Sequence, residues 1–68
     1  MKITLNGQPT DLPDGTDLLG LLALRGVASE LVAIELNESM VPRAKREGVV
    51  LKDGDQVELL KMIAGGTL

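Results

Sequence analysis

The pattern of residues 56–62 constrains the fold more than any other part of the chain. Val57 and Leu59 would lie on one face of a strand, and Leu60 and Met62 on the other face beside Glu58. Neither face is cleanly polar, as expected of a central strand that is covered on one side and contacts a partner on the other. The alternative is that the exposed apolar residues are merely tolerated, because isolated ones are normal on protein surfaces. The pattern predicts a last strand in the middle of a sheet.

Residues 1–12 predict a β-hairpin. Apolar side chains at positions 1, 3 and 5 alternate with polar ones, the period-two pattern of a strand with one buried face. Asn6 and Gly7 follow at once, and both tolerate the positive φ of a type I′ turn. A second, weaker strand is expected over residues 8–12, with Pro9 near its start, where a missing N–H does least harm to the ladder.

A leucine-rich segment after this hairpin predicts one helix. Thr16 is expected to cap its N-terminus, with Asp17 in the first turn, and leucines at positions 18, 21 and 22 share one face. Gly20 costs about 1 kcal/mol relative to alanine inside a helix. Close approach to the sheet is the expected reason for it, and a binding role is the alternative. Gly26 supplies the stop at the C-terminus.

Residues 32–37 predict a third strand, and residues 40–43 predict a short edge strand because they contain Pro42. One helical turn is expected over residues 44–47, and residues 49–51 are expected to cover the end of the core. A turn over residues 52–55 then leads into the last strand.

This order of elements predicts an α+β fold of the β-grasp type, with a mixed sheet of about five strands packed on one helix. The first and last strands would be parallel neighbours, joined through the right-handed crossover that the helix provides. We expect a β-grasp domain over residues 1–63 and a flexible C-terminal tail over residues 64–68.

The composition argues against most catalytic and ligand-binding sites. The 68 residues contain no cysteine, histidine or aromatic residue, which removes disulfides, thiolate nucleophiles, imidazole bases and the usual zinc ligands. The formal net charge of -3 and the lack of stacking side chains argue against nucleic acid as a partner. Aspartates at positions 11, 14 and 17 lie at a turn and a helix start, where capping explains them. We expect no catalytic residue, no metal and no bound cofactor.

The basic residues 43–46 are interpreted as a solvated or partner-facing edge. No apolar run approaches the roughly 20 residues of a membrane span, and residues 1–4 start in a strand pattern without a signal-peptide layout. A cytoplasmic protein with no membrane contact is therefore expected.

The tail offers a reactive group of a different kind. Ala64, Gly65 and Gly66 carry no side chain larger than a methyl group, so the segment can be threaded, extended, through a channel too narrow for side chains. A main-chain carboxylate at Gly66 would become reactive as an adenylate, which a thiol or persulfide can attack. The alternative is a frayed terminus that happens to contain glycine.

Together, three segments resemble the ThiS family of sulfur carriers for thiamin thiazole synthesis: Val41-Pro42-Arg43, Lys52-Asp53-Gly54-Asp55-Gln56-Val57-Glu58 and Ile63-Ala64-Gly65-Gly66. The resemblance implies a ubiquitin-like β-grasp fold. It implies that Gly66 is adenylated and converted to a thiocarboxylate, with Ala64 and Gly65 as the threaded tail. It also implies a ThiF-type adenylyltransferase that uses ATP, a cysteine desulfurase or other persulfide donor, and thiazole synthase as the acceptor. Leu60, Met62 and Ile63 are our own inference for the partner-docking surface.

Thr67 and Leu68 depart from the family pattern, because its chains normally end at the glycine pair. Removal by a peptidase is our first explanation, a cloning remnant the second and a lost activity the third. Other functions stay open: a carrier for molybdopterin (MoaD-type), cysteine or siderophore synthesis, a ubiquitin-like protein modifier, or a plain β-grasp interaction domain. The sequence also leaves the oligomeric state open.

Overall fold

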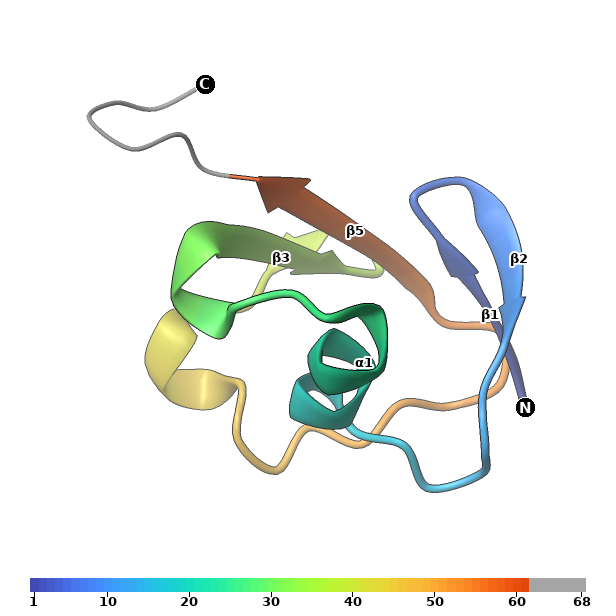
Figure 1. The fold of residues 1–68 in the computed structure, drawn as a ribbon. Helices are drawn as coiled ribbons and strands as arrows, with labels where there is room; N and C mark the ends of the chain where they lie inside the picture. Colours follow the sequence, from blue (N-terminus) through green and yellow to red (C-terminus); the bar gives the residue numbers. More distant parts are fainter. Residues whose placement is uncertain (62–68) are drawn as a thin grey trace.

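The computed structural model describes residues 1–61, which form a five-stranded mixed sheet with a helix against one face (Figure 1). Its elements are β1 (Lys2–Leu5), β2 (Gln8–Asp11), α1 (Leu18–Arg25), the 3-10 turn η1 (Ser29–Leu31), β3 (Val32–Leu36), β4 (Ser39–Met40), the 3-10 turn η2 (Arg43–Lys45) and β5 (Gln56–Lys61). The predicted β-grasp fold is confirmed. Residues 62–68 lie outside the described part, and with them the predicted domain boundary at residue 63 and the predicted tail.

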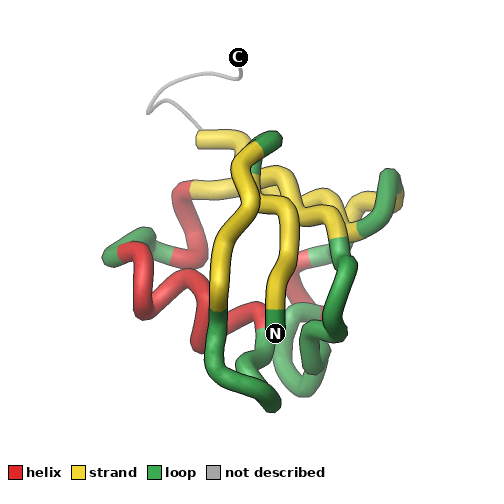
Figure 2. Tube along the Cα trace, turned by 90° about the vertical axis from the view of Figure 1, so that its right-hand side faces the viewer, coloured by secondary structure: helices red, strands yellow, loops and turns green. Residues whose placement is uncertain are grey.

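The strand order is β2-β1-β5-β3-β4, so the last strand lies in the middle of the sheet as predicted. β5 runs parallel to β1, with Leu5 opposite Val57, and antiparallel to β3, with Val32 opposite Lys61. Figure 2 views the β1–β2 hairpin from the front, with the N-terminus at its lower end. Asn6 and Gly7 form the predicted turn of this hairpin, with φ of 50° and 80°.

The core lies between α1 and the inner face of the sheet, and it consists of aliphatic side chains. Its buried members are Ile3, Leu5, Leu12, Leu18, Leu21, Leu22, Val32, Ile34, Leu51 and Val57. Leu51 comes from the segment that was expected to cover the end of the core, and its N–H donates to the Thr16 carbonyl at 2.9 Å. Leu59 is only partly buried against this cluster, so it contributes less to the core than Val57 does.

The N-terminal cap of α1 differs from the prediction by one residue. Asp17, not Thr16, is the N-cap, and its Oδ1 accepts the Gly20 N–H at 2.7 Å. The Thr16 hydroxyl is used in the preceding turn, where it donates to the Pro13 carbonyl at 2.7 Å. At the other end Gly26 caps the helix with φ of 66°, as predicted.

Gly20 does not serve a close approach to the sheet, so that expectation is wrong. A Cβ at this position would lie 2.8 Å from Asp17 Oδ1, and the next nearest atoms belong to Thr16 and Asp17. The space is therefore occupied by the capping carboxylate of the helix itself.

The short edge strand occupies residues 39–40 instead of 40–43. Asn37 and Glu38 form a tight two-residue turn with φ of 51° and 72°, which brings Ser39 opposite Leu36. The Val41 N–H still donates to the Ile34 carbonyl at 2.9 Å, but Pro42 has no N–H with which to continue. The following turn, η2, accordingly starts at Arg43 and not at residue 44.

Arg46 contradicts the interpretation of all of residues 43–46 as a solvated or partner-facing edge. Its side chain is buried, with Nη1 donating to the Ser29 carbonyl at 2.5 Å and Nη2 to the Val32 carbonyl at 2.6 Å. Burial lowers the pKa of the Arg46 guanidinium, and the charge of nearby Arg43 lowers it further. Arg46 thus ties η2 to the start of β3, whereas Arg43 and Lys45 are exposed.

Candidate functional site

The candidate site is the C-terminal half of β5 and the outer face of the sheet around it. β5 leads directly into the segment that contains the predicted tail, and it is paired on both sides at its start. The residues that hold β5 therefore fix the last described strand before the predicted tail in the sequence.

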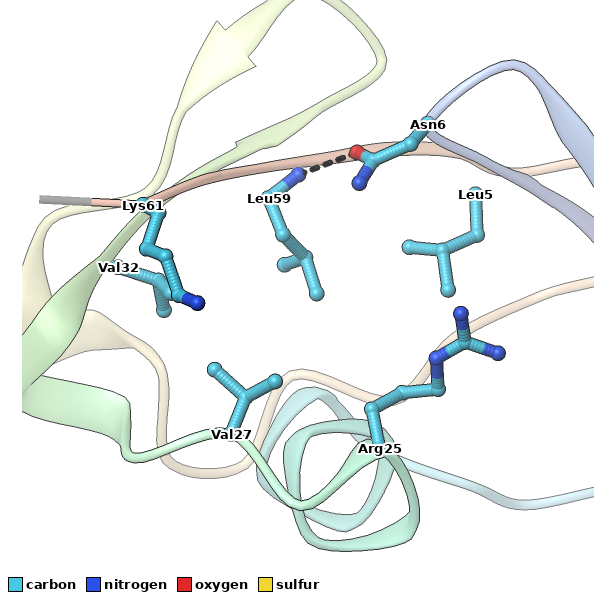
Figure 3. Close-up of a pocket in the computed structure, with 7 residues that line it drawn as sticks. All are labelled: Leu5, Asn6, Arg25, Val27, Val32, Leu59 and Lys61. Carbon is cyan, nitrogen blue, oxygen red and sulfur yellow. Dashed lines mark hydrogen bonds between the residues drawn. The ribbon is translucent and has the colours of Figure 1, made fainter.

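Asn6 holds β5 on the β1 side. Its backbone N–H donates to the Val57 carbonyl at 2.9 Å, and its side-chain Oδ1 accepts the Leu59 N–H at 2.7 Å (Figure 3). The side chain thus takes the place of the next β1 residue, after the chain has turned away at Gly7. This second role of the hairpin asparagine was not predicted, since the pairing partner lies 53 positions away.

Asn37 holds the first residue of β5, on the β3 side. Its backbone N–H donates to the Gln56 carbonyl at 2.8 Å, and its Oδ1 accepts the Gln56 N–H at 2.9 Å. Its Nδ2 donates to Asp55, a buried carboxylate that also accepts the Lys52 N–H at 2.8 Å. Both oxygens of Asp55 therefore accept hydrogen bonds within or beside the turn over residues 52–55, in agreement with the predicted turn.

The outer face of the sheet combines apolar and acidic side chains. Strand register places Met40, Glu35 and Glu58 side by side, because Glu35 lies opposite each of the other two. Leu60, two positions after Glu58, shares this face and is 43% exposed, and Met40 is 55% exposed. We call these four residues, Glu35, Met40, Glu58 and Leu60, the outer patch.

The two glutamates of the outer patch lie directly opposite each other on neighbouring strands, an arrangement that destabilises a sheet. The ion pairs formed within residues 1–61 are those of Asp14 with the Met1 ammonium group and of Asp11 with Lys2, and neither involves Glu35 or Glu58. A basic group from another molecule would relieve this repulsion. The patch therefore has the chemistry of a docking surface for a partner with apolar and basic side chains.

Of the predicted docking residues, the structure places Leu60 on the exposed outer face. Met62 and Ile63 lie outside the described residues, as do the predicted tail residues Ala64, Gly65 and Gly66 and the extra residues Thr67 and Leu68. The sequence analysis missed Met40, Glu35 and Glu58. The pairing register between three strands brings them beside Leu60, and that register cannot be read from local spacing.

No cluster of three or more acidic side chains within residues 1–61 is arranged to hold a metal ion. Asp17 is engaged as a helix cap, and Asp14 accepts a hydrogen bond from the Met1 ammonium group at 2.9 Å. As to membranes, none of the helices within residues 1–61 combines the length and the apolar character that a spanning helix needs.

Comparison with known proteins shows a consistent set of similarities. The family model described as "ThiS family" matches residues 3–66. A thiazole synthase of Magnetococcus marinus is 47% identical over 66 residues, which are 97% of this chain but 20% of that protein. The sulfur carrier protein ThiS of Escherichia coli is 32% identical, over 97% of this chain and 100% of that protein.

A solved structure agrees with these sequence matches. The crystal structure of the thiamine biosynthesis protein ThiS from Geobacter metallireducens superposes with a TM-score of 0.83 at 35% identity. The superposition covers 97% of this chain and 100% of that one. The chain thus spans the full length of the separate carrier proteins and about a fifth of the longer thiazole synthase.

Proposed function

This chain belongs to the ThiS family, and we propose that it is a sulfur carrier for thiamin biosynthesis whose cargo is a thiocarboxylate on Gly66. One observation gives the proposal most of its support. The family model matches residues 3–66, so the match includes the glycine pair and ends at Gly66. The sulfur carrier of Escherichia coli, which this chain matches over almost all of its length, has the same role in its name.

The chemistry needs a free carboxylate at Gly66. Attack of this carboxylate on the α-phosphate of ATP forms a glycyl adenylate and releases pyrophosphate. A persulfide then attacks the glycyl carbonyl, which releases AMP and forms an acyl disulfide. A second thiol of the partners forms a disulfide with the donor's own sulfur, and the thiocarboxylate is released as the leaving group. The protein is the substrate of these steps and supplies no catalytic side chain. ATP and the persulfide belong to its partners, a ThiF-type adenylyltransferase and a cysteine desulfurase or other sulfur donor.

The described residues contribute position and recognition. Asn6 and Asn37 fix β5 on both sides, so that the following residues start from a rigid strand. The outer patch gives the activating enzyme a surface beside that strand, with Leu60 and Met40 for apolar contact and two glutamates for basic groups. A tail of alanine and glycine then suits a narrow channel, because a larger side chain would not pass.

Thiazole synthase is the acceptor that the comparisons favour. A protein of that name contains a segment 47% identical to this chain within a sequence about five times as long. A segment similar to this chain is therefore part of a protein named thiazole synthase, which supports thiazole synthase as the partner here. Because Thr67 follows Gly66, the proposal includes a peptidase that removes Thr67 and Leu68 before activation.

Reconstitution tests the proposal. A version ending at Gly66 is incubated with a ThiF-type adenylyltransferase, ATP, a cysteine desulfurase and cysteine, and its intact mass is measured. We expect a species heavier by one oxygen-to-sulfur exchange, and no such species from the full 68-residue chain without a peptidase. A mass that stays unchanged while a known carrier is converted in the same mixture would contradict the proposed role.

A further inference from the structure

A second surface lies on the helix side of the sheet, away from the outer patch. It is a groove of about 290 Å³ between the C-terminal end of α1 and the second half of β5 (Figure 3). Its apolar wall consists of Leu5, Val27, Val32 and Leu59. The sulfur-carrier role proposed above assigns no function to this groove.

Arg25 and Lys61 lie on opposite sides of this groove. Figure 3 shows the Lys61 side chain directed from β5 toward the groove and the Arg25 guanidinium below Leu5 at the other end of the groove. Within residues 1–61 neither forms an ion pair, and no acidic residue lines the groove. Arg25 occupies the last turn of α1, where a cation is favourable, but that position does not account for Lys61. The groove thus has two cationic sides in a chain whose net charge is -3.

The backbone of β5 is also open toward the groove. The Asn37 N–H donates to the Gln56 carbonyl, so Gln56 is hydrogen-bonded to the β3 side. In an antiparallel ladder every second residue bonds to the same neighbour, so residues 56, 58 and 60 bond to β3. Residues 57, 59 and 61 therefore direct their N–H and carbonyl groups to the β1 side. Val57 and Leu59 meet Asn6 there, and beyond Asn6 none of the described strands runs beside β5 on the β1 side. Among residues 1–61, therefore, the β1 side of Lys61 is an unpaired strand edge, of the kind to which extended peptides add.

We propose that this groove binds an extended acidic segment of a partner protein, which adds a short strand beside the end of β5. Side chains at alternate positions of the segment would face the groove. An aliphatic side chain would cover the wall formed by Leu59 and Val32, and carboxylates on either side of it would meet Arg25 and Lys61. Charge complementarity selects an acidic segment as the occupant, and two separate cations are too few for an anionic membrane surface.

The test uses the full chain, labelled with ¹⁵N, and the peptide acetyl-Glu-Thr-Val-Thr-Glu-amide at low salt. The matched control is acetyl-Lys-Thr-Val-Thr-Lys-amide, which has the same β propensity and the opposite charge. We expect the acidic peptide alone to shift the amide signals of Val27, Leu59 and Lys61 and to slow hydrogen exchange at the Lys61 amide. The double variant Arg25→Glu, Lys61→Glu should bind it at least about fivefold more weakly.

A double variant with the same change of net charge, Lys45→Glu, Lys52→Glu, controls for long-range attraction, since both lysines are exposed and line no part of the groove. Equal loss of binding in the two double variants would overturn the proposal. So would shifts centred on the outer patch, equal response to both peptides, or binding without slower exchange at Lys61. None of these measurements involves sulfur, so this inference and the proposed function can fail separately.

Discussion

Asn6 Oδ1 accepts the backbone N–H of Leu59 at 2.7 Å, although 53 positions separate the two residues. The same asparagine has a φ of 50°, which the hairpin between β1 and β2 requires. One residue therefore both turns the hairpin and continues the parallel pairing of β1 with β5. This bond fixes the last strand at the point where it loses its neighbour.

Replacing Asn6 with glycine should separate these two roles. Glycine keeps the positive φ but removes the acceptor, so we expect a loss of about 0.5–1.5 kcal/mol in the free energy of unfolding. Asn6→Asp is the matched control, because it keeps an acceptor oxygen. Urea denaturation measures the loss, and hydrogen exchange at the Leu59 amide locates it. Unchanged exchange at Leu59 in the glycine variant would show that the bond does not hold β5.

Arg46→Ala should destabilise the fold by about 2–3 kcal/mol, because the buried guanidinium donates to the carbonyls of Ser29 and Val32. Arg46→Lys should recover little of this loss, since a single ammonium group does not reproduce the forked geometry. Lys45→Ala, at an exposed neighbouring position, is the control. Chemical denaturation checks all three. Equal stability of the Arg46 and Lys45 variants would mean that Arg46 has no structural role.

Leu21→Ala should cost about 2–5 kcal/mol, which in a domain of this size is a large part of the total stability. Leu21 is fully buried in the core, whereas Leu59 is only partly buried. Leu59→Ala should therefore lower the melting temperature less than Leu21→Ala does. If thermal unfolding showed the opposite order, the assignment of Leu21 to the core and of Leu59 to its edge would be wrong.

Glu58→Gln should act in opposite directions on stability and on activation. Removal of one charge from the pair with Glu35 should stabilise the sheet by up to about 1 kcal/mol. If the outer patch docks the adenylyltransferase, the same change should slow the release of pyrophosphate, as should Leu60→Ser. Glu30→Gln removes an exposed acid elsewhere and serves as the control. Activation at the normal rate in both patch variants would show that the adenylyltransferase docks on another face.

Gly66→Ala, in a chain that ends at residue 66, should abolish adenylation and leave the melting temperature unchanged. The added methyl group lies at the reacting carboxylate, where a channel shaped for glycine has no room. Ala64→Gly is the matched tail control, because it makes the segment narrower. Pyrophosphate release in the presence of ATP checks the prediction. A fully active Gly66→Ala variant would argue against a tight channel.

Much of the fold could be predicted because its signals are local. Alternation in residues 1–5, the Asn6-Gly7 turn and the Gly26 stop each depend on neighbouring residues, and the structure confirms all three. The central position of β5 could also be predicted from the sequence, because apolar residues on both faces of a strand indicate neighbours on both sides.

Two errors arose where distant residues decide the outcome. Arg46 looked like part of a basic surface cluster, but its partners at Ser29 and Val32 are reached only after the chain folds back. The outer patch was incomplete for the same reason, since Met40 and Glu58 are brought together only by the register of both with Glu35. The error at Gly20 was local instead, because the atom nearest to a Cβ there is a carboxylate oxygen three residues earlier.

The intact mass of the protein purified from its own cells tests the sulfur-carrier role most directly. The account predicts a chain ending at Gly66, part of which is heavier by the replacement of one oxygen with sulfur. That additional mass should disappear in cells that lack the adenylyltransferase. A chain that always retains Thr67 and Leu68 and never gains sulfur would contradict the account, and would leave a β-grasp domain that acts through its surfaces alone.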